Sequence, residues 1–95
     1  MANVRNLKKD VDRWVSEIIT DVQLFVYLQP SKKVDEAYSI IEAAIAMRQQ
    51  LYSRANRPDG KDEPKLVKQH YRSIKRDLLE QSHRLFERVS KLSAE

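Results

Sequence analysis

The chain has two histidines, His70 and His83, and these are the first side chains to consider as metal ligands or general bases. Glu80 precedes His83 by three residues, the Glu-x-x-His spacing that di-iron carboxylate bundles use twice, together with glutamates from two further helices. Here the spacing occurs once. Helical periodicity also places both side chains opposite Ile74 and Leu85, whereas metal ligands would have to face the core. We therefore expect a solvated pair and no metal site.

Nucleophilic catalysis has one tempting arrangement, in which His70, Ser73 and Asp77 follow one another along a single helical segment. Three residues on one helix face cannot present a nucleophile, a base and an orienting acid to one another and also build an oxyanion hole. The chain has no cysteine nucleophile, and its single glycine excludes a glycine-rich phosphate loop. The sequence thus predicts a protein that is not an enzyme and holds no cofactor.

Arg48 interrupts an apolar helix face, at the level expected for Trp14. A buried guanidinium needs compensation, and Asp10, Glu17 and Asp77 are the carboxylates within plausible reach. Alternatively its stem packs while the guanidinium reaches solvent or stacks on the indole ring. We predict a structural ion pair; a ligand or partner anchor in a cleft is the functional alternative.

Five basic residues, here called the basic strip, recur on one side of the C-terminal segment: Lys65, Lys68, Arg72, Lys75 and Arg76. Such a strip can follow a phosphate backbone with salt-dependent affinity. It lacks the interleaved aromatic residues of a protein that binds single-stranded nucleic acid. It also lacks the docking helix of a protein that recognises a DNA sequence. Nearby Asp77, Glu80 and Glu87 dilute its charge. The basic strip is equally well explained as a solvated helix face, on which ion pairs such as Arg76 with Glu80 form one turn apart. We prefer this interpretation to nucleic-acid binding.

The segment from Pro64 to Leu92 is the longest predicted helix. Pro64 suits a first helical position, and the stripe repeats every eleven residues, which keeps it nearly straight along the helix. At about 1.5 Å per residue the helix is roughly 40 Å long, so other helices must cover its stripe. The apolar stripe consists of Val67, Tyr71, Ile74, Leu78, Leu85, Val89 and Leu92, with Ser82 among them.

Two further helices precede it. One covers about residues 4–28 and has a broad apolar face; Pro30 and Ser31 end it and start the next, which covers about residues 32–53. Residues 54–63 contain a Pro-Asp-Gly turn and are predicted to form an exposed loop. Short connections make sequential helices antiparallel, so the prediction is an all-α, up-down-up three-helix bundle. The second helix has a main face of Val34, Ala37, Tyr38, Ile41, Ile45 and Tyr52, and a second strip of Ile40, Ala43, Met47 and Leu51.

Residue counts from each predicted turn place Trp14 level with Gln69 or His70, and Leu28 level with about His83. The C-terminal helix would then outreach its companions by about two turns, leaving apolar residues uncovered. We therefore predict a homodimer or another helical partner; the alternative is that the helix frays or bends after about Leu85. The predicted interface comprises Leu24, Tyr27, Leu28, Ile40, Met47, Leu79, Leu85, Phe86, Val89 and Leu92.

Length, composition and net charge limit the number of domains and the classes of partner. The 95 residues make one small domain with a net charge of +4, mild enough to need no anionic partner. No uncharged apolar segment is long enough to cross a bilayer and the N-terminal residues do not resemble a signal peptide, so a cytoplasmic protein is expected. The sequence favours a small helical interaction or assembly module. Nucleic-acid or anionic-partner binding through the basic strip is the alternative function.

Overall fold

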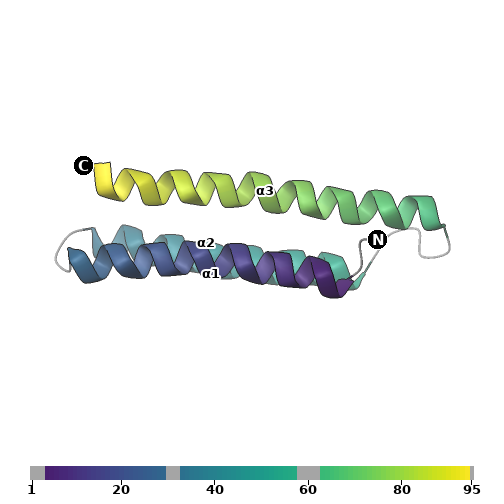
Figure 1. Cartoon of the computed structure of the whole chain (residues 1–95), viewed down its shortest axis with the longest axis horizontal. Coiled ribbons are helices and arrows are strands. Elements are labelled where there is room, and N and C mark those ends of the chain that lie inside the picture. Colours follow the sequence, from purple (N-terminus) through teal and green to yellow (C-terminus); the bar gives the residue numbers. More distant parts are fainter. Residues whose placement is uncertain (1–3, 30–32, 58–62, 95) are drawn as a thin grey trace.

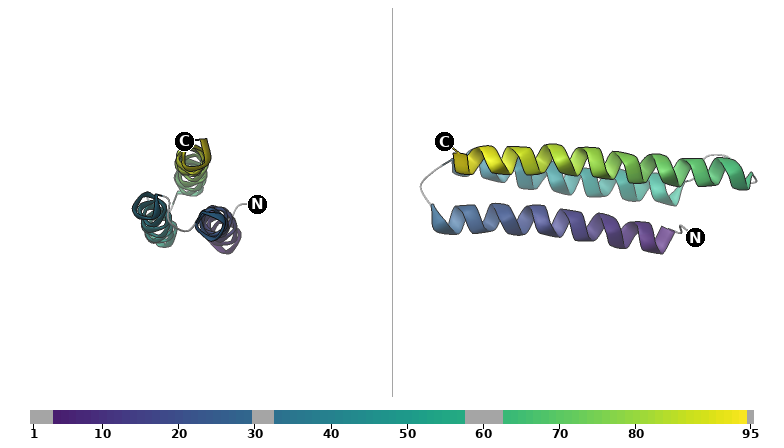
Figure 2. Two further views of the ribbon diagram at one scale, coloured as in Figure 1. Left: turned by 90° about the vertical axis from the view of Figure 1, so that its left-hand side faces the viewer. Right: turned by 45° about the horizontal axis from the view of Figure 1, so that its top comes forward.

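The computed structural model describes residues 4–29, 33–57 and 63–94, and within them the chain forms three helices and no strand. Helix α1 spans Val4–Leu28, α2 spans Val34–Asn56 and α3 spans Pro64–Ala94 (Figure 1). α1 and α3 run in one direction and α2 runs against them, and an end-on view places the helices at the corners of a triangle (Figure 2). The predicted all-α, up-down-up bundle is confirmed; it is a rod of 53 × 19 × 18 Å.

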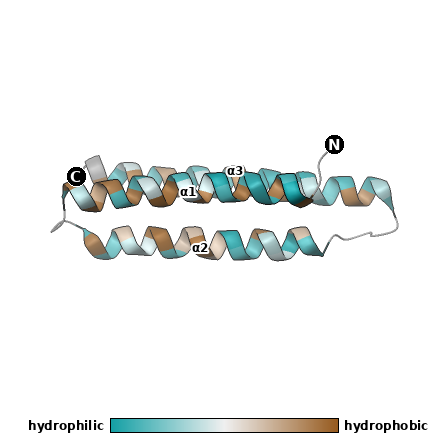
Figure 3. Ribbon diagram, turned by 60° about the horizontal axis from the view of Figure 1, so that its bottom comes forward, coloured by the Kyte–Doolittle hydropathy of each residue, from teal (hydrophilic) through white to brown (hydrophobic). Residues whose placement is uncertain are grey.

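One core runs between the three helices, because each helix carries apolar residues at steps of three and four. Hydrophobic positions recur turn after turn along all of them (Figure 3). Ser82 is the one buried polar side chain among the described residues, and its hydroxyl lies 4.0 Å from the Met47 sulfur. The buried apolar residues are Leu7, Val11, Val15, Ile18, Val22, Phe25, Ala37, Ile40, Ala44, Met47, Leu51, Ala55, Ile74, Leu78, Leu85 and Leu92.

The start of α2 lies at Val34, slightly later than the sequence pattern indicated. Lys33 has a left-handed backbone with a φ of 51°, so the regular right-handed helix starts only after it. The predicted helix stop, N-cap and helix start fell on Pro30, Ser31 and Lys32, which lie outside the described residues.

The end of α2 lies at Asn56, so the predicted loop of residues 54–63 is shorter than expected. Ala55 is helical and buried, which places the last turn of α2 in the core. The predicted Pro58-Asp59-Gly60 turn lies outside the described residues.

The predicted assignment of the two apolar strips of α2 is wrong. The second strip forms the core, with Ile40 and Met47 buried, whereas Tyr38 and Ile45 of the expected main face are 54% and 44% exposed. The buried strip includes alanines, which allow neighbouring helices to approach closely, and no charged residue interrupts it. Arg48 interrupts the other strip, so burying that strip instead would place a guanidinium in the core.

α3 begins at Pro64, as predicted, and its buried positions follow the straight stripe. It projects beyond its companions at its N-terminal end (Figure 1), not at its C-terminal end as expected. The layering was wrong because it assumed that α3 starts level with the end of α2. In the structure Arg54 contacts His70 and Asp77, so the first turn of α3 lies beyond the last turn of α2.

The expectation of an uncovered C-terminal tip on α3 is therefore wrong as well. Leu85 and Leu92 are buried within the single chain, and Phe86 and Val89 are half-buried against the core. Arg88 ties this end of α3 to α2, since its Nη2 lies 3.1 Å from Glu36 Oε1. Six of the ten predicted interface residues are thus wholly or partly covered within one chain: Ile40, Met47, Leu85, Phe86, Val89 and Leu92.

None of α1, α2 and α3, over their described residues, combines the length and the apolar character that a bilayer crossing requires.

Candidate interaction surfaces

The Glu-x-x-His spacing does not bring its two residues into contact. Glu80 and His83 are both exposed, and His83 Nε2 lies 2.9 Å from the carboxylate of Glu87, one turn further along α3. Among the described residues no group of three or more histidine, cysteine or acidic side chains is arranged to hold a metal ion. The histidine therefore forms a surface pair with a different glutamate from the one its motif suggested.

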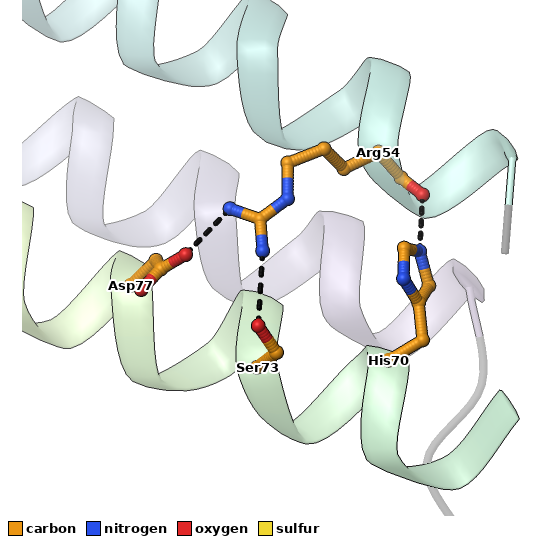
Figure 4. Close-up of polar contacts among 4 residues, drawn as sticks. All are labelled: Arg54, His70, Ser73 and Asp77. Atoms are coloured by element: carbon orange, nitrogen blue, oxygen red, sulfur yellow. Dashed lines mark hydrogen bonds and ion pairs between the residues drawn. The ribbon is translucent and has the colours of Figure 1, made fainter. Parts of the chain in front are cut away.

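Arg54 is the centre of a polar contact between α2 and α3, here called the Arg54 clamp (Figure 4). Its Nη1 donates to Asp77 Oδ2 at 2.6 Å and its Nη2 donates to Ser73 Oγ at 3.1 Å. The Arg54 carbonyl oxygen lies 2.6 Å from His70 Nε2 and can only accept, so Nε2 carries the proton in this contact. Ser73, Asp77 and His70 thus all face Arg54, and they fasten one helix to another.

Arg48 pairs with Asp12, a carboxylate outside the predicted set. Arg48 Nε lies 2.9 Å from Asp12 Oδ1, and the Tyr52 hydroxyl donates to the same oxygen at 2.6 Å. Two cations lie over the Tyr52 ring: the Arg48 guanidinium is 4.2 Å from the ring centre, and Lys8 Nζ is 5.1 Å from the same point. The alternative of stacking on the Trp14 ring is not among these interactions, and the guanidinium is partly exposed.

Mutual hydrogen bonding fixes the charge states of this group. The Tyr52 hydroxyl and then the Arg48 guanidinium hold the pKa of the Asp12 carboxyl below its ordinary 3.8, although burial acts the other way. The bond to Asp12 raises the pKa of Arg48 above its usual range. Burial and the same carboxylate raise the pKa of Tyr52 above 10.0. Because no group here is poised to titrate near neutral pH, the arrangement suits a structural tie between α1 and α2 better than acid–base chemistry.

The basic strip is exposed along its whole length. None of its five side chains forms an ion pair or hydrogen bond with another described residue, so the predicted pair of Arg76 with Glu80 is not present. Between Pro64 and Arg76 the sequence has no acidic residue, and the next carboxylate, Asp77, is bound by Arg54. The cations of the basic strip are therefore available to an external anion.

Charge is divided unequally along the rod. The contacts of Met47 with Ser82 and of Trp14 with Phe86 mark one level across the three helices. The basic half, residues 4–13, 48–57 and 63–82, holds twelve lysines and arginines and five acidic residues. The acidic half, residues 14–29, 33–47 and 83–94, holds four lysines and arginines and six acidic residues. The described chain therefore carries +7 at one end and −2 at the other.

One apolar surface outside the core, here called the α1–α2 face, consists of Ile19, Tyr38, Ile41 and Ile45. The three α2 residues recur at helical spacing, and Ile19 of α1 lies with Ile45 in an open groove between the two helices. Tyr38 and Ile45 are exposed, and Ile19 and Ile41 are half-buried. None of the four was among the predicted interface residues, although the two apolar strips of α2 were a signal that one of them would remain outside.

A second apolar surface lies at the end of α1, where Leu24, Tyr27 and Leu28 are exposed. Leu24 and Leu28 line a groove together with Val89 of α3. These three α1 residues and Leu79 are the predicted interface residues that remain accessible in the single chain, and Leu79 belongs to the basic half.

The chain matches no described protein family, and no curated protein or solved structure is similar to it. What it can bind must therefore be inferred from its own surfaces.

Proposed function

We propose that the protein is a non-catalytic helical assembly module that pairs with a second copy of itself through the α1–α2 face. One observation carries the proposal: α2 has two apolar strips, and the core of the single chain leaves Tyr38 and Ile45 of one of them exposed. An apolar strip left on a small soluble domain commonly marks a protein–protein contact. A second bundle can cover it by laying its own helices along the groove between α1 and α2.

The size of the molecule is compatible with such a contact. A stable interface covers about 800 Å² of each partner, roughly an eighth of the 6704 Å² surface of this chain. The rod is 53 Å long, and its α1–α2 groove follows the long axis, so an interface of this area can form without new loops or refolding.

Charge favours an antiparallel arrangement. Two copies related by a two-fold axis that is perpendicular to the rod and passes through this face, which lies within the acidic half, place their basic halves at opposite ends of the pair. A parallel pair would place the two halves of net charge +7 side by side, which costs free energy through like-charge repulsion. The antiparallel homodimer therefore covers the apolar strip and keeps the two basic halves apart.

Sedimentation equilibrium of the full chain and of an Ile45→Asp variant tests the proposal. A carboxylate in the centre of the face should weaken dimerisation by about 100-fold or more, because an unpaired charge would be desolvated there. Leu66→Asp is the matched control, since Leu66 is 45% exposed and Ile45 is 44% exposed but Leu66 lies on α3, away from the face. Circular dichroism confirms that each variant remains helical.

Three results would contradict this assignment. If the native chain remains monomeric at high concentration, the proposed self-association is wrong. If Leu66→Asp weakens dimerisation as much as Ile45→Asp does, the α1–α2 face is not the interface. Dissociation by Leu28→Asp, with Ile45→Asp unchanged, would transfer the interface to the end of α1, where Leu28 is exposed beside Leu24.

A further inference from the structure

We infer that the basic strip on α3 binds the phosphate backbone of duplex nucleic acid without reading its sequence. The inference is independent of the proposed self-association, because it concerns another helix and the other end of the rod. It rests on three features together: the strip begins on the projecting N-terminal turns of α3, its cations are exposed, and none is paired with a described residue.

The structure keeps the neighbouring carboxylate from competing for these cations. Asp77 is the first acidic residue after the strip, and Arg54 neutralises it; Glu80, the next carboxylate, forms no described ion pair with the strip. In an ordinary solvated helix face, lysines and arginines alternate with carboxylates one turn away and pair with them. That arrangement is found further along α3, where His83 pairs with Glu87. It is not found among the described contacts of the strip.

The shape of the strip favours a duplex over a single strand. Lys65 and Arg76 are eleven residues apart, which is about 16 Å on a rigid helix, and a duplex presents about one negative charge per 1.7 Å of its axis. A single-strand binder stacks bases on aromatic side chains, and the strip contains none. Lysine and arginine contacts with phosphate oxygens position a protein on the backbone and carry no sequence information, and Gln69 is the exposed amide side chain that lies among these cations.

An anionic membrane is the competing macromolecular surface. Helices that lie on membranes place a continuous apolar face beside their cations and bury it among the lipid chains. The apolar stripe of α3 is instead occupied by the core of the bundle, where Ile74 and Leu78 are buried at the level of the strip. The exposed leucines of α3, Leu66 and Leu79, are thirteen residues apart and form no continuous apolar face, so the strip suits a rigid polyanion better than a bilayer.

The test is fluorescence anisotropy of the full chain with a labelled DNA duplex of arbitrary sequence, titrated at several salt concentrations. Five phosphate contacts predict a slope of about −4.5 for log K against log salt. The double variant Arg72→Gln with Lys75→Gln should weaken binding on the order of 10-fold to 100-fold near 0.1 M salt and reduce the slope by about 2.

The matched control is the double variant Arg84→Gln with Lys91→Gln. It removes the same charge from two exposed residues of the same helix, outside the strip, so it should change affinity by less than about 3-fold. If the two double variants lose affinity for the duplex equally, binding responds to net charge alone and the basic strip is not the site. Failure to bind the duplex at low salt would also overturn it, as would binding confined to vesicles containing phosphatidylserine.

Discussion

The two halves of this rod leave different chemistry exposed. In the basic half, α3 projects past its companions and carries five cations that no described residue neutralises. In the acidic half, the C-terminal turns of α3 are covered, while apolar side chains such as Tyr38 and Tyr27 remain at the surface of α2 and α1. Most of the cations therefore lie in one half and most of the exposed large apolar side chains in the other, with Leu66 and Leu79 as exceptions in the basic half. One end can bind a polyanion while the remainder supplies an interface.

The two ends of α3 should respond very differently to the same loss of apolar side chain. Leu92→Ala removes a residue that is only 2% exposed and should lower the free energy of unfolding by about 2–4 kcal/mol. Leu66→Ala, at the projecting end, should change it by less than about 0.5 kcal/mol. Urea unfolding followed by circular dichroism measures both. Similar losses for the two variants would mean that the projecting end packs as tightly as the C-terminal end.

The Arg54 clamp should govern how firmly the basic half of α3 is held. Arg54→Ala removes the bonds to Asp77 and Ser73, and because these groups are about one-third exposed the loss should be only about 1 kcal/mol. Amide hydrogen exchange should accelerate over residues 64–76 and change less over residues 83–92. Arg57→Ala, which removes an exposed arginine beyond the last turn of α2, is the control and should leave exchange unchanged. Uniform acceleration along α3 would contradict a local role.

The smallest effect concerns pH. Asp12 has a pKa below its ordinary 3.8, so its contribution to stability is present above that value and is lost as pH falls through the lower, folded-state value. Tyr52 has a pKa above 10.0, so its contribution is present below pH 10.0 and is lost as pH rises through the folded-state value. The stability difference between the native chain and Asp12→Asn should thus be flat around neutral pH and shrink in acid. A difference that changes between pH 5 and 8 would contradict the assigned pairing.

The helices and their order could be predicted from the sequence because local signals agreed. Pro64 marks a helix start, and the three-and-four spacing of apolar residues persists through each helix. Which face of α2 packs into the core could not be predicted as firmly, because both of its strips are apolar. The outcome depends on how closely the alanines of one strip let the neighbouring helices approach. The position of α3 along the rod depends on where the chain re-enters the bundle after residue 57, which loop length alone does not determine.

The basic strip and part of the apolar surface followed from sequence, whereas the polar partners did not. Arg48 was expected to find a carboxylate, and the i, i+4 spacing of Arg48 and Tyr52 was an unused signal that one acceptor could serve both. Asp12 supplies that acceptor, but its level on α1 relative to α2 depends on how the two helices pack. Exposure of the strip and the absence of described ion pairs along it likewise required the assembled bundle.

The most direct test of the antiparallel pair is the distance between equivalent sites in two associated copies. The chain has no cysteine, so one spin label can be attached through Ser53→Cys in the basic half or Glu42→Cys near the α1–α2 face, both at exposed positions, and measured by double electron–electron resonance. In an antiparallel pair centred on this face, the labels at residue 53 should be separated along the rod by roughly 30 Å, and those at residue 42 by much less. Equal distances at the two sites would indicate a parallel pair, and no dipolar coupling at either site would indicate a monomer; both would contradict the account.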